Sequence, residues 1–173
     1  YSHLYNIPCT GLRLFTVYGP WGRPDMAPMI FAKSIFANEP IKIFNHGLMA
    51  RDFTFIEDVI RCISKLIEKP ATKNKTFDYQ NPDPSSSWCP HQVFNLGNNK
   101  TIKLMDFISI LEKEIGQKAI KKYMPMQPGD VEETYADTDK IFNYIGFKPD
   151  TEINIGIKKF ISWYKEYNFN QKY

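Results

Sequence analysis

Long apolar runs and clustered charge are both missing from this sequence, and their absence excludes several classes of protein. No stretch approaches the roughly 20 consecutive apolar residues that a membrane-spanning helix needs. The net charge is only +3, from 22 basic and 19 acidic residues that are scattered along the chain. Nucleic-acid-binding surfaces gather their Lys and Arg residues, so this balance argues against such a partner. We therefore expect neither a membrane nor a nucleic acid as a partner.

Cysteine and histidine are scarce as well. The three cysteines, Cys9, Cys62 and Cys89, are odd in number and have no CxxC spacing, which argues against a disulfide framework or a zinc site. The three histidines are isolated and form no HExxH motif, so no metal site is predicted. The first five residues lack the basic start and the apolar run of a signal peptide, and a cytoplasmic location is expected.

Familiar catalytic and phosphate-binding signatures are also absent. The sequence contains neither a GxGxxG nor a Walker-type loop, and no serine stands in a GxSxG elbow. The acidic pairs Glu57-Asp58 and Glu132-Glu133 are adjacent in sequence, and such neighbours do not converge on one side of a helix or strand. The residues by themselves therefore nominate no catalytic group.

What is present is a hydrophobic pattern that predicts helices alternating with short strands. Strands are predicted at residues 11–18, 41–44 and 93–96, and helices at residues 27–38, 56–68, 104–115, 139–145 and 153–168. Residues 70–91 and 123–129, which are rich in proline, are predicted to be loops. This alternation favours the α/β class, and 173 residues fit one domain or a large piece of one.

Polar residues gather at the boundaries of the predicted elements, where open α/β sheets bind their ligands. Thr16 lies near the end of the first predicted strand, and the segment from Tyr18 to Asp25 follows it. Arg51 follows a glycine turn and offers a planar set of donors suited to phosphate or carboxylate. An ion pair with Asp52 or Asp58 accounts for Arg51 equally well.

The segment Gln127-Pro128-Gly129-Asp130 puts two hydrogen-bonding side chains around a rigid turn. Taken alone, ordinary turn chemistry explains this segment better than a ligand site does, because Pro, Gly and Asp are favoured in turns for conformational reasons.

Four segments in order carry a resemblance to a known family. They are GLRLFTVYGPWGRPDMAPMIF from Gly11, RDFTFIEDVI from Arg51, FNLGN from Phe94 and QPGD from Gln127. Together they resemble the C-terminal half of a nucleotide-sugar epimerase of the extended short-chain dehydrogenase/reductase family. The UDP-glucuronate 4-epimerases are the most similar branch, because TVYGPWGRPDMA is specific to it. The resemblance runs from Tyr1 to about Tyr167.

The resemblance implies that residues 1–173 are the nucleotide-sugar-binding portion of an NAD-dependent enzyme. They would supply the last strands of a Rossmann-type sheet and a small α/β substrate-binding domain. The NAD-binding half, with its Gly-rich turn and catalytic Tyr-x-x-x-Lys pair, would precede Tyr1. No lysine stands four residues after Tyr1 or Tyr5, so no catalytic residue is expected here and the chain alone is expected to be inactive. A homodimer is implied, formed through that other half.

The resemblance also implies roles for particular residues. Thr16 and Arg23 resemble groups beside the sugar carboxylate, and Arg51 resembles the arginine that grips the diphosphate. Phe44 is expected on the strand whose backbone meets the uracil.

Three further positions follow from the same resemblance. Gln127 and Asp130 resemble the pair that holds phosphate and ribose. Many relatives have Arg where Gln127 stands, so this sequence has one positive charge fewer at the diphosphate. The backbone from Tyr18 to Pro20 resembles the segment that hydrogen-bonds the nicotinamide of NAD.

For the complete enzyme, the resemblance implies NAD-dependent 4-epimerisation of UDP-glucuronate to UDP-galacturonate. Two alternatives stay open: a decarboxylase or 4,6-dehydratase on the same scaffold, and a truncated product that at most binds UDP-sugars. Marginal stability is expected for the chain alone, because the strand at residues 11–18 would lack most of its sheet neighbours.

Overall fold

The computed structural model describes residues 1–169, and its helices and strands alternate as the α/β prediction requires. The strands are β1 (Cys9–Leu14), β2 (Thr16–Tyr18), β3 (Pro40–Ile43), β4 (Ala50–Phe55), β5 (His91–Leu96), β6 (Thr101–Lys103) and β7 (Ile120–Tyr123). The helices are α1 (Ser2–Tyr5), α2 (Ala27–Phe36), α3 (Ile56–Glu68), α4 (Leu104–Ile115), α5 (Asp139–Ile145) and α6 (Ile153–Phe169), with a 3-10 turn, η1 (Phe44–Gly47). In this part of the chain, no helix is long and apolar enough to cross a membrane.

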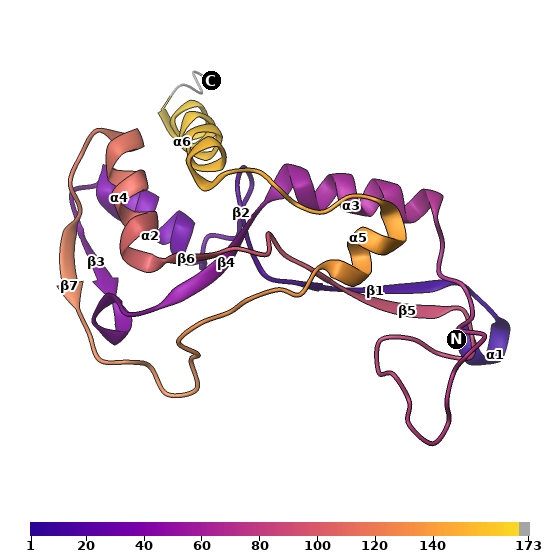
Figure 1. Ribbon diagram of the computed structural model, residues 1–173. Coiled ribbons are helices and arrows are strands. Elements are labelled where there is room, and N and C mark those ends of the chain that lie inside the picture. Colours follow the sequence, from indigo (N-terminus) through magenta and orange to yellow (C-terminus); the bar gives the residue numbers. More distant parts are fainter. Residues whose placement is uncertain (170–173) are drawn as a thin grey trace.

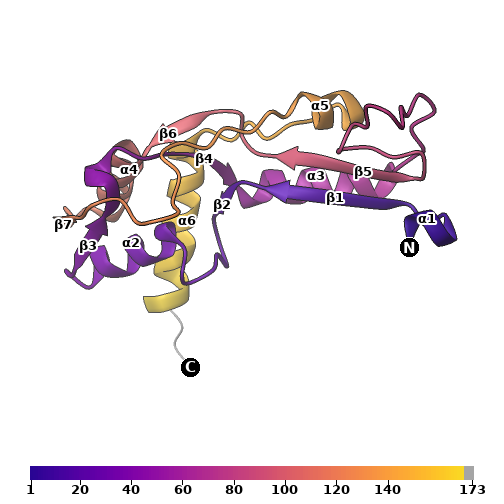
Figure 2. The ribbon, with the colours of Figure 1, turned by 90° about the horizontal axis from the view of Figure 1, so that it is seen from below.

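The strands form three small sheets. β1 pairs with β5 in parallel, β3 pairs with β7 in parallel, and β4 lies between parallel β2 and antiparallel β6. Figures 1 and 2 both show an elongated molecule, with β1 and β5 extending to one end and β3, β7, α2 and α4 gathered at the other. The long connections between parallel partners carry the helices, as parallel pairing demands.

The larger core lies where α2, α4 and α6 cover the strands β2, β3 and β4. Apolar residues of α4 recur at helical spacing, so that Phe107, Ile108 and Leu111 are all fully buried. Phe53 of β4 stacks on Phe107 with ring centroids 4.3 Å apart. Each such side chain contributes roughly 1.5–3 kcal/mol on burial, and this stacking fixes α4 against β4.

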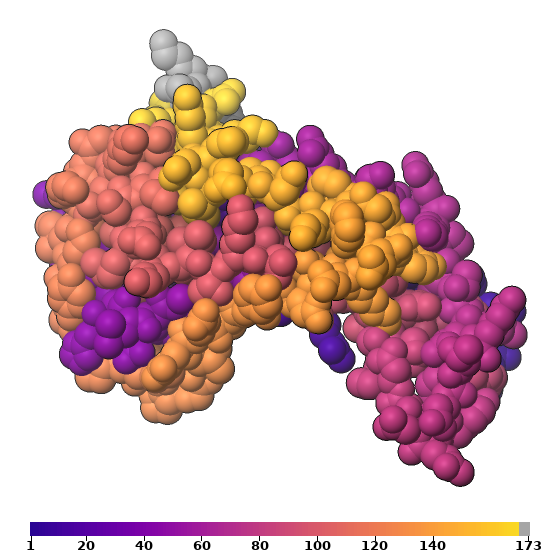
Figure 3. Space-filling model, viewed as in Figure 1, coloured from indigo at the N-terminus to yellow at the C-terminus, as the bar shows by residue number. Residues whose placement is uncertain are grey.

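A smaller core joins α3, α5 and β5, and its buried members include Cys62, Phe94 and Ile141. Ile56, at the start of α3, packs against both cores and links them. The loop at residues 70–91 projects beyond the smaller core at the other end of the molecule from β7 (Figure 3). It contains no helix and no strand before β5 begins at His91, as its proline content predicted.

The predicted strand at residues 11–18 is divided in two. β1 ends at Leu14, and the N–H of Phe15 donates to the carbonyl of Leu96 at 3.2 Å before the chain leaves β5 and joins β4 as β2. In residues 1–169, β1 pairs only with β5, and Leu14 is 51% exposed. An apolar edge is therefore present as expected, while the marginal stability inferred from it stays a prediction.

The sequence pattern also misses β4, β6 and β7. β4 was overlooked because its polar residues are buried together with its aromatic ones: Asp52 and Thr54 are as inaccessible as Phe53 and Phe55. The apolar–polar alternation that marks a half-buried strand is therefore lost. The structure places Arg51 and Asp52 inside strand β4, and not at a boundary between elements as the sequence suggested.

Tyr18 fills the larger core directly beneath Gly156 of α6. Its hydroxyl is buried and has no hydrogen-bond partner among residues 1–169, and burial followed by the nearby Asp58 charge raises the pKa of Tyr18. A Cβ at position 156 would overlap the Tyr18 hydroxyl. Close approach of α6 to β2 therefore requires glycine at this position.

We expect Gly156→Ala to destabilise the chain by about 1–3 kcal/mol, because the added methyl overpacks the core. Urea denaturation followed by circular dichroism measures the change. Tyr18→Phe should recover part of the loss, since it removes the overlapping oxygen. Gly11→Ala is the matched control, because a Cβ there makes only ordinary van der Waals contacts, with Val93 at 3.4 Å and the Gln92 carbonyl oxygen at 3.8 Å. Equal stability of Gly156→Ala and the parent chain would contradict this packing.

Glu112 ties the end of α4 to β7. Its buried carboxylate accepts from Lys121, from Lys118 at 3.0 Å and from the Ala119 N–H at 3.0 Å. Burial opposes ionisation, but these hydrogen bonds outweigh it and lower the pKa of Glu112 from 4.5 to about 2. A carboxyl with a depressed pKa stabilises the folded state above its unfolded pKa, and that stability is lost as the pH falls through the folded pKa.

We therefore expect Glu112→Gln to cost on the order of 3 kcal/mol at pH 7 and progressively less from pH 5 down to pH 2. The free energy of unfolding, measured by urea titration across this range, gives the profile. Glu68→Gln, at an exposed position of α3, is the control and should leave the slope unchanged. A parent chain and Glu112→Gln variant with parallel pH profiles would contradict the expectation.

Candidate functional site

A cavity of about 820 Å³ opens beside the larger core, with one wall from α2 and β3 and another from β4 and the turn before residue 131. Five of the six residues expected to bind substrate line this cavity: Thr16, Phe44, Arg51, Gln127 and Asp130. They come from β2, η1, β4 and the turn at residues 127–130. Apolar side chains complete the lining, chiefly Ile30, Phe31, Ile41, Met49, Phe53 and Leu104.

Arg51 is the only arginine among the lining residues, and its side chain is 19% exposed. Its Nη2 donates to Asp130 Oδ1 at 2.7 Å. Its Nη1 donates to the carbonyls of Ala50 at 2.8 Å and Glu132 at 3.0 Å. A guanidinium carries more N–H donors than these bonds use, so Arg51 is held in place with capacity for a further acceptor.

The ion pair of Arg51 therefore differs from the alternative that the sequence suggested. Its partner is Asp130, 79 residues further along the chain, and not Asp52 or Asp58. Asp52 is occupied by backbone N–H groups, including that of Asn98 at 2.6 Å. Asp58 accepts the N–H of Thr151 at 2.9 Å. The turn before Val131 thus contributes to the cavity as well as reversing the chain.

Phe44 lies one residue beyond β3, in the turn η1, and not on the strand as expected. Asn45 and His46 follow with positive φ angles of 47° and 50°, so the extended conformation stops there. The backbone of this turn is bonded to the residue that follows β7: the N–H of His46 donates to the carbonyl of Met124 at 3.1 Å. Phe44 nevertheless reaches the cavity.

Arg23 is not among the lining residues. Its side chain is 73% exposed and forms two hydrogen bonds with Asp25, one of them from Nε at 3.1 Å. The hydrogen bonds from Arg23 lower the pKa of Asp25, which does line the cavity. The structure thus places Arg23 at the rim, attached through Asp25.

Tyr18 and Pro20, expected to face NAD through their backbone, do not line the cavity either. The Tyr18 side chain lies in the core, and Gly19 (φ 136°) turns the chain where a Cβ would lie 2.5 Å from Ile56 Cγ2. The backbone at residues 18–20 therefore turns sharply between β2 and α2. Its contact with a cofactor stays a prediction.

Two polar lining residues lie outside the segments that the sequence singled out: Ser34 and Lys42. A third, Asp25, ends the segment from Tyr18 to Asp25 that was expected near a site, but it was given no role of its own. A signal for Lys42 exists, since the alternation in β3 buries Ile41 and Ile43 and turns Lys42 to the other face. Ser34 shares a helical face with Ile30 and Phe31, but that relation becomes informative only once the cavity is known.

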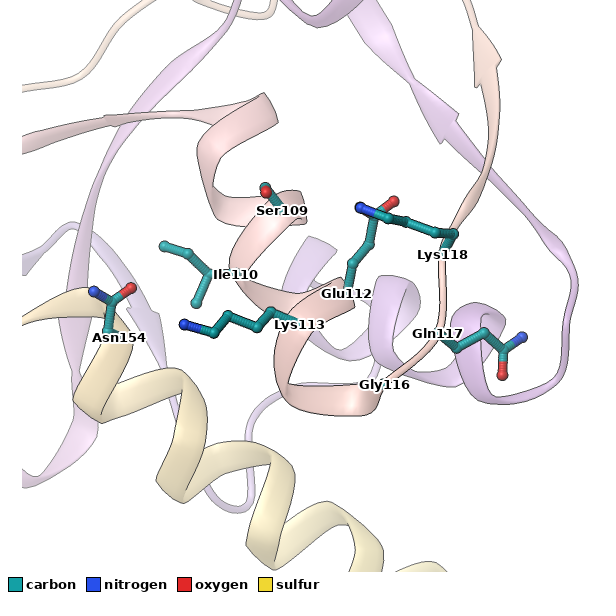
Figure 4. A pocket seen from close by; sticks show the side chains of 8 residues that line it. All are labelled: Ser109, Ile110, Glu112, Lys113, Gly116, Gln117, Lys118 and Asn154. Atoms are coloured by element: carbon teal, nitrogen blue, oxygen red, sulfur yellow. The ribbon is translucent and has the colours of Figure 1, made fainter.

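A second cavity, of about 410 Å³, lies between the end of α4 and the start of α6 (Figure 4). In Figure 4, Lys113 points from α4 toward Asn154 of α6, while Lys118 lies over Glu112. The Glu112 carboxylate is already used by its own chain, and none of the predicted site residues lines this cavity. The 820 Å³ cavity is therefore the candidate site.

Comparison with known proteins shows which family the chain resembles. The model of the NAD dependent epimerase/dehydratase family matches residues 1–80. Protein CapI of Staphylococcus aureus is 53% identical over 167 residues, which make up 96% of this chain and 50% of that protein. The chain is therefore similar to members of the NAD dependent epimerase/dehydratase family. The probable UDP-glucuronate 4-epimerase of Rhizobium meliloti is 41% identical, over 96% of this chain and 49% of that protein.

The crystal structure of UDP-glucuronic acid 4-epimerase from Bacillus cereus, in complex with UDP-glucuronic acid and NAD, is similar in fold. The TM-score is 0.79 at 31% identity, and the match covers 96% of this chain and 48% of that one. The chain thus spans about half the length of the relatives that it matches.

The Arg51–Asp130 pair is expected to stabilise the chain by about 1 kcal/mol, because the pair is partly buried and joins distant segments. A double-mutant cycle with Arg51→Ala and Asp130→Ala, followed by urea denaturation, measures the coupling. The Arg23–Asp25 pair is the control: it is exposed, and its two members should show no measurable coupling. The pair would be energetically silent if the effects of Arg51→Ala and Asp130→Ala simply added.

Proposed function

We propose that this chain is the C-terminal, nucleotide-sugar-binding portion of an NAD-dependent UDP-glucuronate 4-epimerase, and that the 820 Å³ cavity holds the UDP-sugar. The observation that carries the proposal is the convergence of Thr16, Phe44, Arg51, Gln127 and Asp130 on one cavity. The relatives support it, since they include UDP-glucuronate 4-epimerases of which this chain spans about half.

The chemistry of the cavity suits the parts of such a ligand. Phe31, Phe44 and the neighbouring apolar residues offer a surface for a planar base, which a polar cavity would not. The Arg51 guanidinium suits a diphosphate, which carries more charge than the carboxylate that it now contacts. Asp130, released from Arg51, accepts hydrogen bonds from ribose hydroxyls.

At the sugar end, Thr16 donates its hydroxyl to the uronate carboxylate, and Arg23 swings in from the rim to pair with the same group. A uronic acid oxidised at C4 has its ketone β to the carboxylate and readily loses CO₂. Holding the carboxylate in one orientation opposes that loss. Anchoring the diphosphate on Arg51 meanwhile lets the sugar turn over without leaving the site.

NAD, bound in the complete enzyme, supplies the redox step at C4. Within this chain, the turn at Tyr18–Pro20 would offer such a cofactor backbone groups, because the Tyr18 side chain is buried in the core and Gly19 has none. The remainder of the NAD site and the Tyr-x-x-x-Lys pair would come from the other half of such an enzyme, so we expect residues 1–173 to be inactive when tested by themselves.

The proposal predicts that the chain binds UDP-glucuronate more tightly than UDP-glucose in calorimetric titration. Arg51→Ala should weaken binding of both sugars by about 10–100-fold, because it removes charge-assisted hydrogen bonds to the diphosphate. Thr16→Val should instead reduce the preference for the uronate, since its partner is the carboxylate. Arg61→Ala, an exposed position on α3, is the control for net charge.

Equal losses in Arg51→Ala and Arg61→Ala would show that Arg51 acts only through net charge, and would contradict the assignment of the diphosphate. Equal affinity for UDP-glucose and UDP-glucuronate would favour another nucleotide-sugar reaction on the same scaffold. Binding of neither sugar by the parent chain would favour a truncated piece with no function of its own.

A further inference from the structure

Asp52 is a fully buried carboxylate on β4 that lies next to Arg51 but outside the cavity lining. Its Oδ1 accepts from the N–H of Asn98 at 2.6 Å and from the Thr54 hydroxyl at 3.2 Å. Its Oδ2 accepts from the N–H groups of Asn99 at 3.0 Å and Ala136 at 3.1 Å. In residues 1–169, Asp52 has no salt bridge to a cation, so the hydrogen bonds from backbone N–H groups stabilise its negative charge.

These hydrogen bonds join three separate parts of the chain: β4, the turn between β5 and β6, and residues 130–137, which we call the binding strap. Figures 1 and 2 show the chain running from β7 past β4 to α5 through this segment. The three parts are in close contact. A Cβ at Gly97 would overlap Ala136 and lie 2.9 Å from Asp52 Oδ2, so the turn has room only for glycine.

The binding strap has little other regular pairing with β4. Ala50 forms an isolated bridge with Glu133, with its N–H donating to Glu132 at 2.9 Å and its carbonyl accepting from Thr134 at 3.3 Å. The N–H of Asp52 then donates to Thr134 Oγ1 at 3.2 Å. Asp52 therefore holds the strap twice, through its own backbone at Thr134 and through its carboxylate at Ala136.

We infer that Asp52 is a positioning residue for the cavity. By fixing Thr134 and Ala136, it sets the register of the binding strap on β4. That register brings Asp130 to 2.7 Å from Arg51 and carries the adjoining Gln127 to the cavity. The inference rests on the proposed function, because Asp130 and Gln127 are proposed contacts of the UDP-sugar.

The variant Asp52→Asn tests this role, because it keeps the size of the side chain but replaces an acceptor oxygen with a nitrogen that cannot accept. Hydrogen–deuterium exchange of the full chain should become at least tenfold faster in the binding strap and at Asn98–Asn99. Affinity for UDP should fall about tenfold, the loss expected when one charged hydrogen bond is removed. Asp130→Asn should then cost less affinity in the Asp52→Asn background than in the parent chain.

Asp58→Asn is the matched control. Asp58 is equally buried and also holds backbone N–H groups, those of Asp150 at 3.3 Å and Thr151 at 2.9 Å, but it does not touch the strap. It should lower stability while leaving strap exchange and UDP affinity unchanged. If Asp52→Asn does not fold, Thr134→Ala replaces it, and Thr134→Ser, which keeps the hydroxyl, should restore both readouts.

Unchanged strap exchange in Asp52→Asn or Thr134→Ala would overturn the inference. So would equal losses of UDP affinity in Asp52→Asn and Asp58→Asn, because the effect would then be one of general stability. Absence of UDP binding by the parent chain would overturn the proposed function. In that case, strap exchange would still support or contradict the structural role of Asp52 by itself.

Discussion

The carboxylate of Asp52 is the contact on which the arrangement around β4 depends. A charge removed from water is costly unless hydrogen bonds replace its hydration, and here three backbone N–H groups and a hydroxyl do so. The donors belong to segments that share no continuous sheet. One face of β4 is thus held by polar contacts, while Phe53 and Phe55 on the same strand enter the larger core. Packing and hydrogen bonding fix the strand from both sides.

The candidate site follows from that constraint. Because β4 is fixed, Arg51 projects from a rigid strand, and its guanidinium is further held by two carbonyls and the Asp130 carboxylate. A site built on strands holds its side chains in more precise positions than a site built only on loops. The apolar wall from α2 and β3 belongs to the larger core. The cavity therefore has a well-packed apolar wall on one side and the charged Arg51 on another. That combination suits a ligand with a planar base at one end and a diphosphate beyond it.

Much of the fold could be predicted where local pattern and burial agree. The helix of residues 104–115 has the predicted bounds because its apolar residues recur at helical spacing and Gly116 ends it with a φ of 85°. The strand β4 could not be found this way, since Asp52 and Thr54 are buried by partners up to 84 residues away. For the same reason, the pairing of Arg51 with Asp130 was invisible to local rules. The family resemblance nominated both residues, and the structure supplied their contact. The resemblance also suggested Arg23, but the structure does not bring it into the cavity, because its pairing with Asp25 keeps it at the rim.

The proposed function requires that a UDP-sugar occupy the cavity beside Arg51. Titration of the isotope-labelled chain with UDP-glucuronate, followed by two-dimensional NMR, locates the bound ligand. We expect saturable shifts concentrated at Thr16, Phe44, Arg51 and Asp130, with Ser109, Lys113 and Asn154 unaffected. Shifts concentrated instead around Lys113 and Asn154, in the cavity between α4 and α6, would contradict it, as would a spectrum that does not change.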